Sequence, residues 1–250
     1  MFTVFIKSAI KYDILYIIIM DKEPVQESQE MFKHLESVHP HITLRREHFR
    51  HTPKDTRDRI AKYVVHLMAE SADFLFKERY GHRAIVLETI AAVPGLIGGF
   101  FQHLKSLRFI RDDHHWIKTL LDEAENERMH LLIYSEIAKP TRFERFMIVI
   151  IQLIFSLVYS LVYLISPRTA HRVVGYFEEE AINSYEHYLQ LVQDGKHENI
   201  SATALAKKYW NLKEDARLTD VIEATIIDEM AHRDVNHAFS QDVYGTRMWS

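Results

Sequence analysis

The sequence predicts an all-α protein, on the strength of three observations. Only seven Gly and six Pro occur among 250 residues, whereas a β-sandwich or barrel needs turn residues every ~8–12 positions. Hydrophobic residues make up 47% and charged residues 26% of the chain, a composition that suits long amphipathic helices. Cysteine is absent, which excludes disulfide scaffolds, thiolate-bound metals and thiol nucleophiles.

Seven segments are predicted to be helical. They are residues 55–79, 82–110, 113–138, 141–165, 169–194, the short 201–209, and 218–239. Breaker residues set their ends: Gly81 is expected to stop the first helix, while Pro140, Pro167 and Gly195 follow the third, fourth and fifth. A kink is expected at Pro94 in the second. Because the loops are short, neighbouring helices are expected to pack antiparallel.

These helices are expected to form one domain over residues 55–242. Residues 1–54 are expected to be an N-terminal arm, partly disordered, because residues 21–54 are polar and carry three Pro. Residues 243–250 are expected to be a short C-terminal tail. The apolar run near the N-terminus is too short to span a membrane. Met20 is an alternative start, which leaves open whether residues 1–19 belong to the native protein.

Residues 146–165 form a run of 20 residues without a charge, long enough to span a membrane. Gln152, Ser156 and Ser160 lie four apart and form a stripe suited to packing on protein. Both ends of the run are basic, whereas a spanning helix carries its positive charge mainly on one side. We therefore expect a helix lying in the plane of one leaflet; a buried core helix and a true span are the alternatives.

Glutamate and histidine three residues apart share one helix face, so both can reach one metal ion. Such pairs occur at Glu127/His130, Glu229/His232 and Glu36/His39. The third pair lies in the polar arm, and we interpret it as chance. The first two lie among apolar residues at helical spacing, where an unpaired carboxylate costs several kcal/mol and needs a cation or a proton.

Two further acids, Glu88 and Glu178, have apolar neighbours on the same helix face. The chain therefore repeats the order Glu, then Glu-x-x-His. Ferritin-like four-helix di-iron bundles use this arrangement, and the predicted ligands are Glu88, Glu127, His130, Glu178, Glu229 and His232. The alternative is that these residues are solvated faces and capping acids, which fits any one of them better than all six in order.

The predicted ligand set consists of carboxylates and imidazoles without thiolate, which favours iron or manganese. Two such ions bridged by carboxylates favour redox chemistry with dioxygen. The formal net charge is −4 and the basic residues are dispersed, so nucleic acid is not an expected partner.

Four strings carry a resemblance to a known family. They are LETIAAVPG (87–95), LLDEAENERMHL (120–131), SPRTAHRVVGYFEEEA (166–181) and DEMAHRDVNH (228–237). They closely resemble the alternative oxidases, which are cyanide-insensitive di-iron quinol oxidases bound to one leaflet of a membrane. The resemblance covers roughly residues 55–240, and four motifs in order make it specific. It implies two iron ions, amphipathic membrane-binding helices beside the bundle, and a homodimer.

The resemblance also implies roles for individual residues. Tyr185 matches the family's redox-active tyrosine, and it lies seven residues after Glu178 on the same helix face. The implied quinol contacts are Arg83 and Ser184. The implied residues that orient metal ligands are Asn126, His171 and Asp228.

The chain departs from the family pattern in a few places. Phe177 stands where the family has Leu, and Ser184 where it typically has Thr. Ile226 and Ile227 replace an Arg and an Ala, so an ion pair made by that Arg is missing. Without Cys, the thiol control of plant members is not expected.

The resemblance implies a non-proton-pumping terminal oxidase that oxidises ubiquinol and reduces O2 to water. The alternatives are a quinone-modifying di-iron hydroxylase of the same bundle class and a non-enzymatic membrane-associated helical scaffold. A bacterial inner membrane, facing the cytoplasm, is the favoured location, with the matrix face of the mitochondrial inner membrane as the alternative.

Overall fold

The structure, a computed structural model, describes residues 26–76 and 79–242, and these are helical without a β-strand; Ser201 and Arg217 form one isolated bridge. The helices are α2 (Gln26–Val38), α3 (Thr56–Phe76), α4 (Tyr80–Phe109), α5 (Trp116–Ala138), α6 (Arg142–Ile165), α7 (Pro167–Gln193), α8 (Ala204–Tyr209) and α9 (Leu218–Phe239). The all-α prediction is confirmed. The expectations for residues 1–19 and for the tail 243–250 lie outside the described residues.

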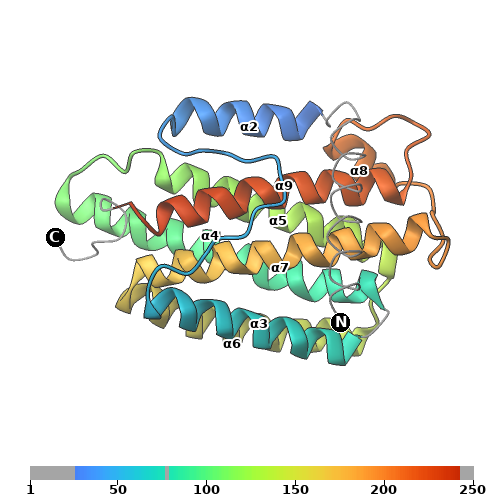
Figure 1. The fold of residues 1–250 in the computed structure, drawn as a ribbon, viewed down its shortest axis with the longest axis horizontal. Helices are drawn as coiled ribbons and strands as arrows, with labels where there is room; N and C mark the ends of the chain where they lie inside the picture. Colours follow the sequence, from blue (N-terminus) through green and yellow to red (C-terminus); the bar gives the residue numbers. More distant parts are fainter. Residues whose placement is uncertain (1–25, 77–78, 243–250) are drawn as a thin grey trace.

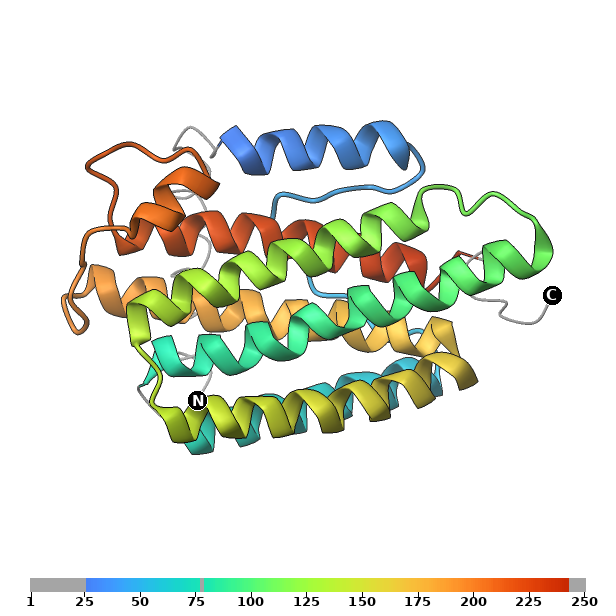
Figure 2. The same ribbon diagram turned by 180° about the vertical axis from the view of Figure 1, so that it is seen from behind.

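Four long helices, α4, α5, α7 and α9, form a bundle at the centre of the molecule (Figures 1 and 2). The most extensive pairs are α4 with α5 and α7 with α9. On one side of the bundle α3 packs on α7 and α6 packs on α4, while α2 covers α9 on the opposite side. The predicted four-helix bundle with additional helices is confirmed.

Local chemistry explains most helix ends. Thr141 and Glu144 form a reciprocal capping box at the start of α6. Pro167 occupies the first turn of α7, where its missing N–H costs nothing. Gly195 follows α7 with a φ of 73°, the left-handed conformation that glycine adopts without strain. Gly81, expected to stop the first helix, instead lies in the first turn of α4, where an added Cβ would come within 3.0 Å of Ala138 Cβ.

Close approach of α4 and α5 aligns the middle of the bundle. Pro94 lies inside α4, and the helix continues beyond it to Phe109. At Gly95 an added Cβ would overlap the carbonyl oxygen of Leu120 on α5. The absence of a side chain there lets the two backbones meet, two turns from Glu88.

A helix, α2, lies within the segment expected to be an arm. Its apolar residues Phe32 and Leu35 are buried in the main core. Beyond it, Arg233 of α9 donates hydrogen bonds to the carbonyl oxygens of Arg45 and Glu47 at 2.8 and 2.9 Å. Residues 26–54 are therefore packed against the bundle, and the polar composition of this segment conceals that packing.

The outer surfaces of α3, α4 and α6 are apolar. On α3, Ile60, Val64 and Leu67 form the expected apolar side, yet that side is exposed. On α6, only Tyr159 and Tyr163 are buried. We call this surface the apolar face. Its main residues are Ile60, Tyr63, Val64 and Leu67 on α3, Leu96, Phe100 and Leu107 on α4, and Phe146, Leu153, Leu157 and Leu161 on α6.

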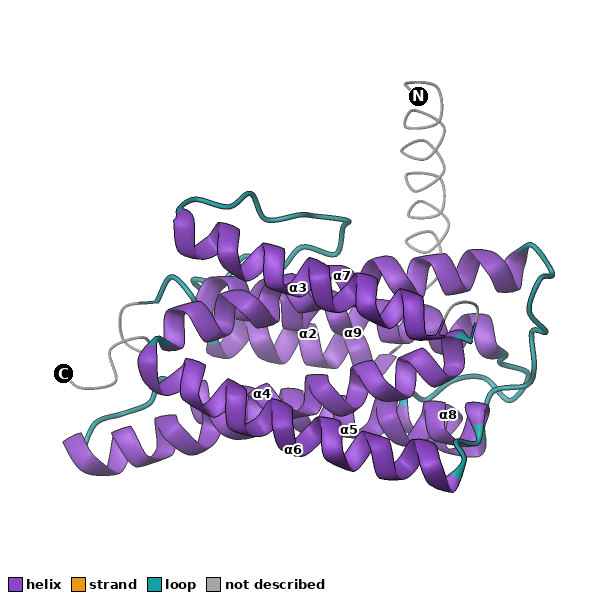
Figure 3. Cartoon of the chain, turned by 90° about the horizontal axis from the view of Figure 1, so that it is seen from below, coloured by secondary structure: helices purple, strands orange, loops and turns teal. Residues whose placement is uncertain are grey.

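Figure 3 views the molecule from the side of α3 and α6. The stripe of Gln152, Ser156 and Ser160 is half-buried, as expected of the side of α6 that packs on protein. The alternative of a core helix at 146–165 is wrong, because only 11% of the apolar window of α6 is buried, against 67% for α4. By length and composition alone, both helices are able to cross a membrane.

Candidate metal centre

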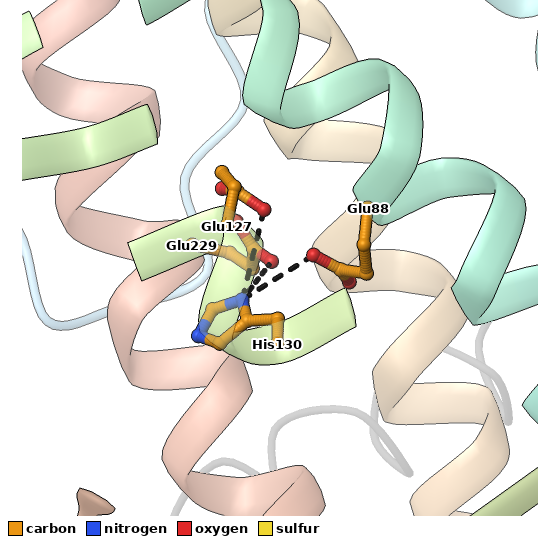
Figure 4. A group of neighbouring side chains, drawn as sticks. All are labelled: Glu88, Glu127, His130 and Glu229. Atoms are coloured by element: carbon orange, nitrogen blue, oxygen red, sulfur yellow. Dashed lines mark ion pairs between the residues drawn. The ribbon is translucent and has the colours of Figure 1, made fainter. Parts of the chain in front are cut away.

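All six predicted ligands are buried at the centre of the bundle. Each has an exposed fraction of 3% or less: Glu88 on α4, Glu127 and His130 on α5, Glu178 on α7, and Glu229 and His232 on α9. Each Glu-x-x-His pair spans one helical turn, so its two side chains leave the helix in the same direction. Figure 4 shows four of these residues, from three helices, pointing toward one another.

His130 lies between three carboxylates. Its Nδ1 is 3.3 Å from Glu88 Oε2, 3.6 Å from Glu127 Oε2 and 3.4 Å from Glu229 Oε1. One ligand atom from each of these four residues lies within 4.8 Å of the other three. Three oxygens and one nitrogen at this spacing surround a point that suits a single cation.

His232 faces the same two bridging carboxylates from the other side. Its Nδ1 is 2.7 Å from Glu127 Oε1 and 3.3 Å from Glu229 Oε2. Glu127 and Glu229 therefore each turn one oxygen toward His130 and the other toward His232. The two imidazoles therefore lie on either side of two shared carboxylates, an arrangement that resembles two-metal sites.

Glu178 stands outside the group of four but belongs to the same buried region. Neither of its carboxylate oxygens has a hydrogen-bond partner within residues 26–76 and 79–242. Burial, together with the carboxylates of Glu229 and Glu127, raises its pKa well above the usual range, while the charge of His232 acts in the opposite direction. Glu178 is thus electrostatically coupled to the His232 side of the cluster.

The protonation of the cluster reflects crowding of like charges in a dry site. Burial and then the carboxylates of Glu127 and Glu229 raise the pKa of Glu88. Burial alone would lower the pKa of His130, but contacts with Asp228 and the three glutamates raise it. Four buried carboxylates carry more negative charge than two protonated imidazoles can neutralise. Bound protons or cations must balance the remaining negative charge. The unpartnered atoms and the oxygen and nitrogen donors fit metal ions such as iron or manganese.

A hydrogen-bond network fixes the His130 ring. Its Nε2 lies 3.2 Å from Asp228 Oδ2, which also accepts from Asn126 Nδ2 at 2.9 Å and Trp210 Nε1 at 2.9 Å. Ser28 Oγ donates to the other oxygen of Asp228 at 2.6 Å. An outer carboxylate of this kind holds Nδ1 toward the metal position. The structure thus places Asn126 and Asp228 beside the cluster.

Tyr185 and His171 differ in their distance from the cluster. The Tyr185 hydroxyl donates a hydrogen bond directly to Glu88. His171 is buried one layer away, where it contacts Tyr163 Oη at 3.2 Å and Asn236 Oδ1 at 2.9 Å. Its link to the cluster is therefore indirect, through Asn236.

The sequence reasoning missed several polar residues around the cluster. Glu123 is buried and accepts two hydrogen bonds from Asn236 Nδ2, at 3.0 and 2.9 Å. Burial raises its pKa to about 7. It lies four residues before Glu127, so helical spacing was a signal that could have found it. No sequence pattern could have identified Trp210 and Ser28, because only the tertiary packing brings them into contact with Asp228.

Arg83 lines a small cavity between α3, α4 and α7, on the side of the apolar face. The cavity measures about 50 Å³ and has an otherwise apolar lining that includes Leu87, Ile90 and Phe177, with Glu180 beside them. Ser184 is buried but does not line this cavity. Of the two predicted quinol contacts, only Arg83 therefore reaches it.

Fold and site together define a helical bundle with a buried carboxylate–histidine cluster that could hold metal ions. The chain matches the family described as alternative oxidase over residues 41–241, and it belongs to that family. It is 50% identical over 193 residues to Ubiquinol oxidase 2, mitochondrial, of Arabidopsis thaliana, covering 77% of this chain and 54% of that protein.

Two further relatives have similar identity. Alternative oxidase 3, mitochondrial, of Glycine max is 50% identical over 194 residues, 78% of this chain and 59% of that protein. Ubiquinol oxidase 2, mitochondrial, of Nicotiana tabacum is 47% identical over 78% of this chain and 65% of that protein. The chain thus spans between about half and two thirds of the length of these curated relatives.

Proposed function

We propose that this protein is a non-proton-pumping ubiquinol oxidase, which transfers the electrons of two ubiquinol molecules to O2 and releases two molecules of water. The observation that carries the proposal is the pair of carboxylates, Glu127 and Glu229, that each face both imidazoles. The names of the relatives, ubiquinol oxidase and alternative oxidase, support the choice of substrate.

We assign two iron ions to the cluster. Glu88 and His130 would hold one ion, Glu178 and His232 the other, and Glu127 and Glu229 would bridge them. The two irons would supply the redox chemistry that reduces dioxygen. The Nδ1 atoms of the histidines would be the donor atoms, because they face the carboxylates of Glu127 and Glu229 at 2.7–3.6 Å.

Tyr185 is the proposed catalytic residue among the chain's own groups. Its hydroxyl donates a hydrogen bond to Glu88, which is a proposed metal ligand. A proton and an electron given up by Tyr185 would therefore be released directly beside the metal centre. Burial raises the pKa of this phenol well above its usual value, which keeps it protonated until it is oxidised. Asn126 and Asp228 would keep His130 in its donor orientation, and His171 would act through Asn236.

Quinol would approach from the apolar face. The cavity beside Arg83 lies between α3, α4 and α7 and is lined mostly by apolar side chains, as a quinone ring requires. Arg83 would hydrogen-bond a ring oxygen in this cavity. Ser184 lies outside the cavity, one helical turn after the lining residue Ala181 on α7, and would contribute its hydroxyl to a quinol that extends beyond it. The carboxylate of Glu180 in the same lining is placed to accept a quinol proton.

The apolar face is proposed to lie on one leaflet of a membrane. α3 and α6 lie on the same side of the bundle (Figure 3), and both carry exposed apolar side chains. Arg142, Arg145 and Arg168 lie at the two ends of the uncharged run 146–165 of α6, in position for contact with anionic headgroups. The relatives named above are mitochondrial, which supports the mitochondrial inner membrane over a bacterial one; cell fractionation tests this. We propose that residues 55–242 form the di-iron oxidase domain. We also propose that the protein is a homodimer.

The deciding experiment is oxygen uptake by iron-loaded, detergent-purified protein supplied with ubiquinol. We expect cyanide-insensitive uptake of one O2 for two quinols, with unmodified ubiquinone as the product. Glu127→Ala should lose bound iron and oxygen uptake together, whereas the exposed Glu136→Ala on the same helix should keep both. A hydroxylated quinone product would favour the hydroxylase, and an unchanged fold with no iron and no uptake in the parent protein would favour the scaffold.

A further inference from the structure

A polar pocket of about 300 Å³ reaches the cluster from the side opposite the apolar face. It lies between α2, α5, α8 and α9, and its lining includes His232, one of the proposed ligands. The cavity beside Arg83 is lined by residues of α3, α4 and α7. The two pockets therefore lie on different sides of the bundle, and of these two only the polar one is lined by a proposed ligand.

The pocket runs from exposed residues to fully buried ones. Glu30, His34 and Asp122 line it and are exposed, whereas Glu123 and Asp228 line it with exposed fractions of 4% and 1%. We call the first three residues the mouth of the pocket. Polar side chains are thus present both at the mouth and beside the proposed ligand His232, although Met31, Leu35 and Val235 also line the pocket.

The lining carries an excess of negative charge. Four carboxylates, those of Glu30, Asp122, Glu123 and Asp228, line the pocket, and no Lys or Arg is among the described residues that do so. Lys118 contacts Asp122 at 2.6 Å, but both side chains are at least half exposed, so solvent screens this pair. A cleft lined by one sign of charge concentrates ions of the opposite sign.

Two buried polar atoms at the bottom of the pocket lack hydrogen-bond partners among the described residues. They are His232 Nε2 and Asn126 Oδ1. The Nδ1 edge of His232 faces Glu127 and Glu229, so Nε2 lies on the opposite edge of the ring, toward the pocket that His232 lines. A nitrogen acceptor and an amide oxygen here suit a hydrated cation or its water ligands.

We infer that this pocket is the entry route by which Fe²⁺ reaches the buried cluster. The inference rests on the proposed di-iron function. The mouth carboxylates draw the hydrated ion from solvent, Glu123 and Asn126 contact its water shell, and the ion exchanges water for the carboxylates beside His232. The apolar side of the protein offers a divalent cation no comparable path.

The test measures how fast chelator-treated full-length protein removes Fe²⁺ from anaerobic solution in stopped-flow mixing. Glu30→Gln combined with Asp122→Asn removes both mouth charges at exposed positions. The matched control, Glu70→Gln combined with Glu136→Gln, removes two exposed charges from α3 and α5 outside the pocket. Charge reversal with Glu30→Lys and Asp122→Lys provides a graded third variant.

We expect the neutral mouth variant to load iron about three- to tenfold more slowly than the control at low ionic strength, with the charge-reversal variant slower still. All variants should reach the same final iron content, and the difference should shrink at about 0.5 M salt. Equal loading rates for mouth and control variants would overturn the entry route, as would a lower final iron content at an unchanged rate. A parent protein that binds no iron would instead refute the proposed function.

Discussion

Two adjacent glutamates on α7 should respond in opposite directions to the same substitution. Glu178 and Glu179 are both buried, with exposed fractions of 1% and 5%. In the part of the chain that the structure describes, neither carboxylate oxygen of Glu178 has a hydrogen-bond partner. Glu179 Oε1 accepts hydrogen bonds from the backbone N–H of His51 at 2.7 Å and from His237 Nε2 at 2.9 Å. The two carboxylates are therefore both buried, but only that of Glu179 accepts hydrogen bonds.

In the metal-free protein, Glu178→Leu removes unsatisfied buried oxygens and keeps the volume. An unsatisfied buried polar group costs about 1–3 kcal/mol, so we expect stabilisation by about 2 kcal/mol. For a chain of this size that raises Tm by roughly 4–8 °C. Glu179→Leu leaves two buried donors unpaired, which should cost about 3–5 kcal/mol and lower Tm by roughly 10 °C.

Iron reverses the ranking of Glu178→Leu and the parent protein. Saturating Fe²⁺ should raise the Tm of the parent, because a ligand at 1,000 times its Kd adds about 4 kcal/mol, whereas the Glu178→Leu variant should gain much less. The assay is thermal unfolding followed by far-UV circular dichroism, with and without Fe²⁺. A metal-free Glu178→Leu variant that unfolds below the metal-free parent, or that keeps the full iron-induced rise, would refute the reasoning.

Three further outcomes follow from single contacts. Tyr185→Phe should retain iron but lose at least about tenfold in quinol oxidase rate, since it removes the hydroxyl that contacts Glu88; iron analysis and oxygen uptake check this. Gly175→Ala should lower the free energy of unfolding by about 1–3 kcal/mol in denaturant titration, because its Cβ would lie 2.5 Å from the Nδ1 of buried His237. Burial lowers the pKa of His171 from 6.5 to about 4, so its neutral ring favours the folded state above pH 6.5 and that contribution is lost as pH falls toward 4. Melting curves from pH 8 to pH 5 should show the parent losing about 2 kcal/mol more than His171→Gln.

The clustering of the proposed ligands was predictable in part, because the placement of each Glu-x-x-His pair follows from local geometry. A carboxylate and an imidazole three residues apart share a helix face in any α-helix, and Glu127/His130 and Glu229/His232 both lie as this rule requires. The predicted helix over residues 218–239 coincides with α9. Spacing alone could not locate Ser28 against Asp228, because those two residues are 200 positions apart in the chain.

Helical periodicity could not predict that the apolar side of α3 faces outward. Ile60, Val64 and Leu67 recur at helical spacing, which indicates an apolar side but not what covers that side. In the structure this stripe is exposed, while Ala61 and Val65 on the other side of α3 are buried against α7. Large apolar residues thus face outward on α3, which is unusual for a helix on the surface of a soluble protein and fits a lipid-facing helix.

The two halves of the cluster are alike in sequence but not in their outer contacts. Asp228, just before Glu229, lies against the Nε2 of His130 on the opposite helix. Asn126 holds the corresponding place before Glu127, yet its amide donates to Asp228 and its oxygen finds no hydrogen-bond partner in the described part of the chain. An anionic partner strengthens a histidine as a metal donor, so His130 is the more tightly oriented ligand. His232 keeps one free ring nitrogen beside the polar pocket, which makes its half of the cluster the more accessible from solvent.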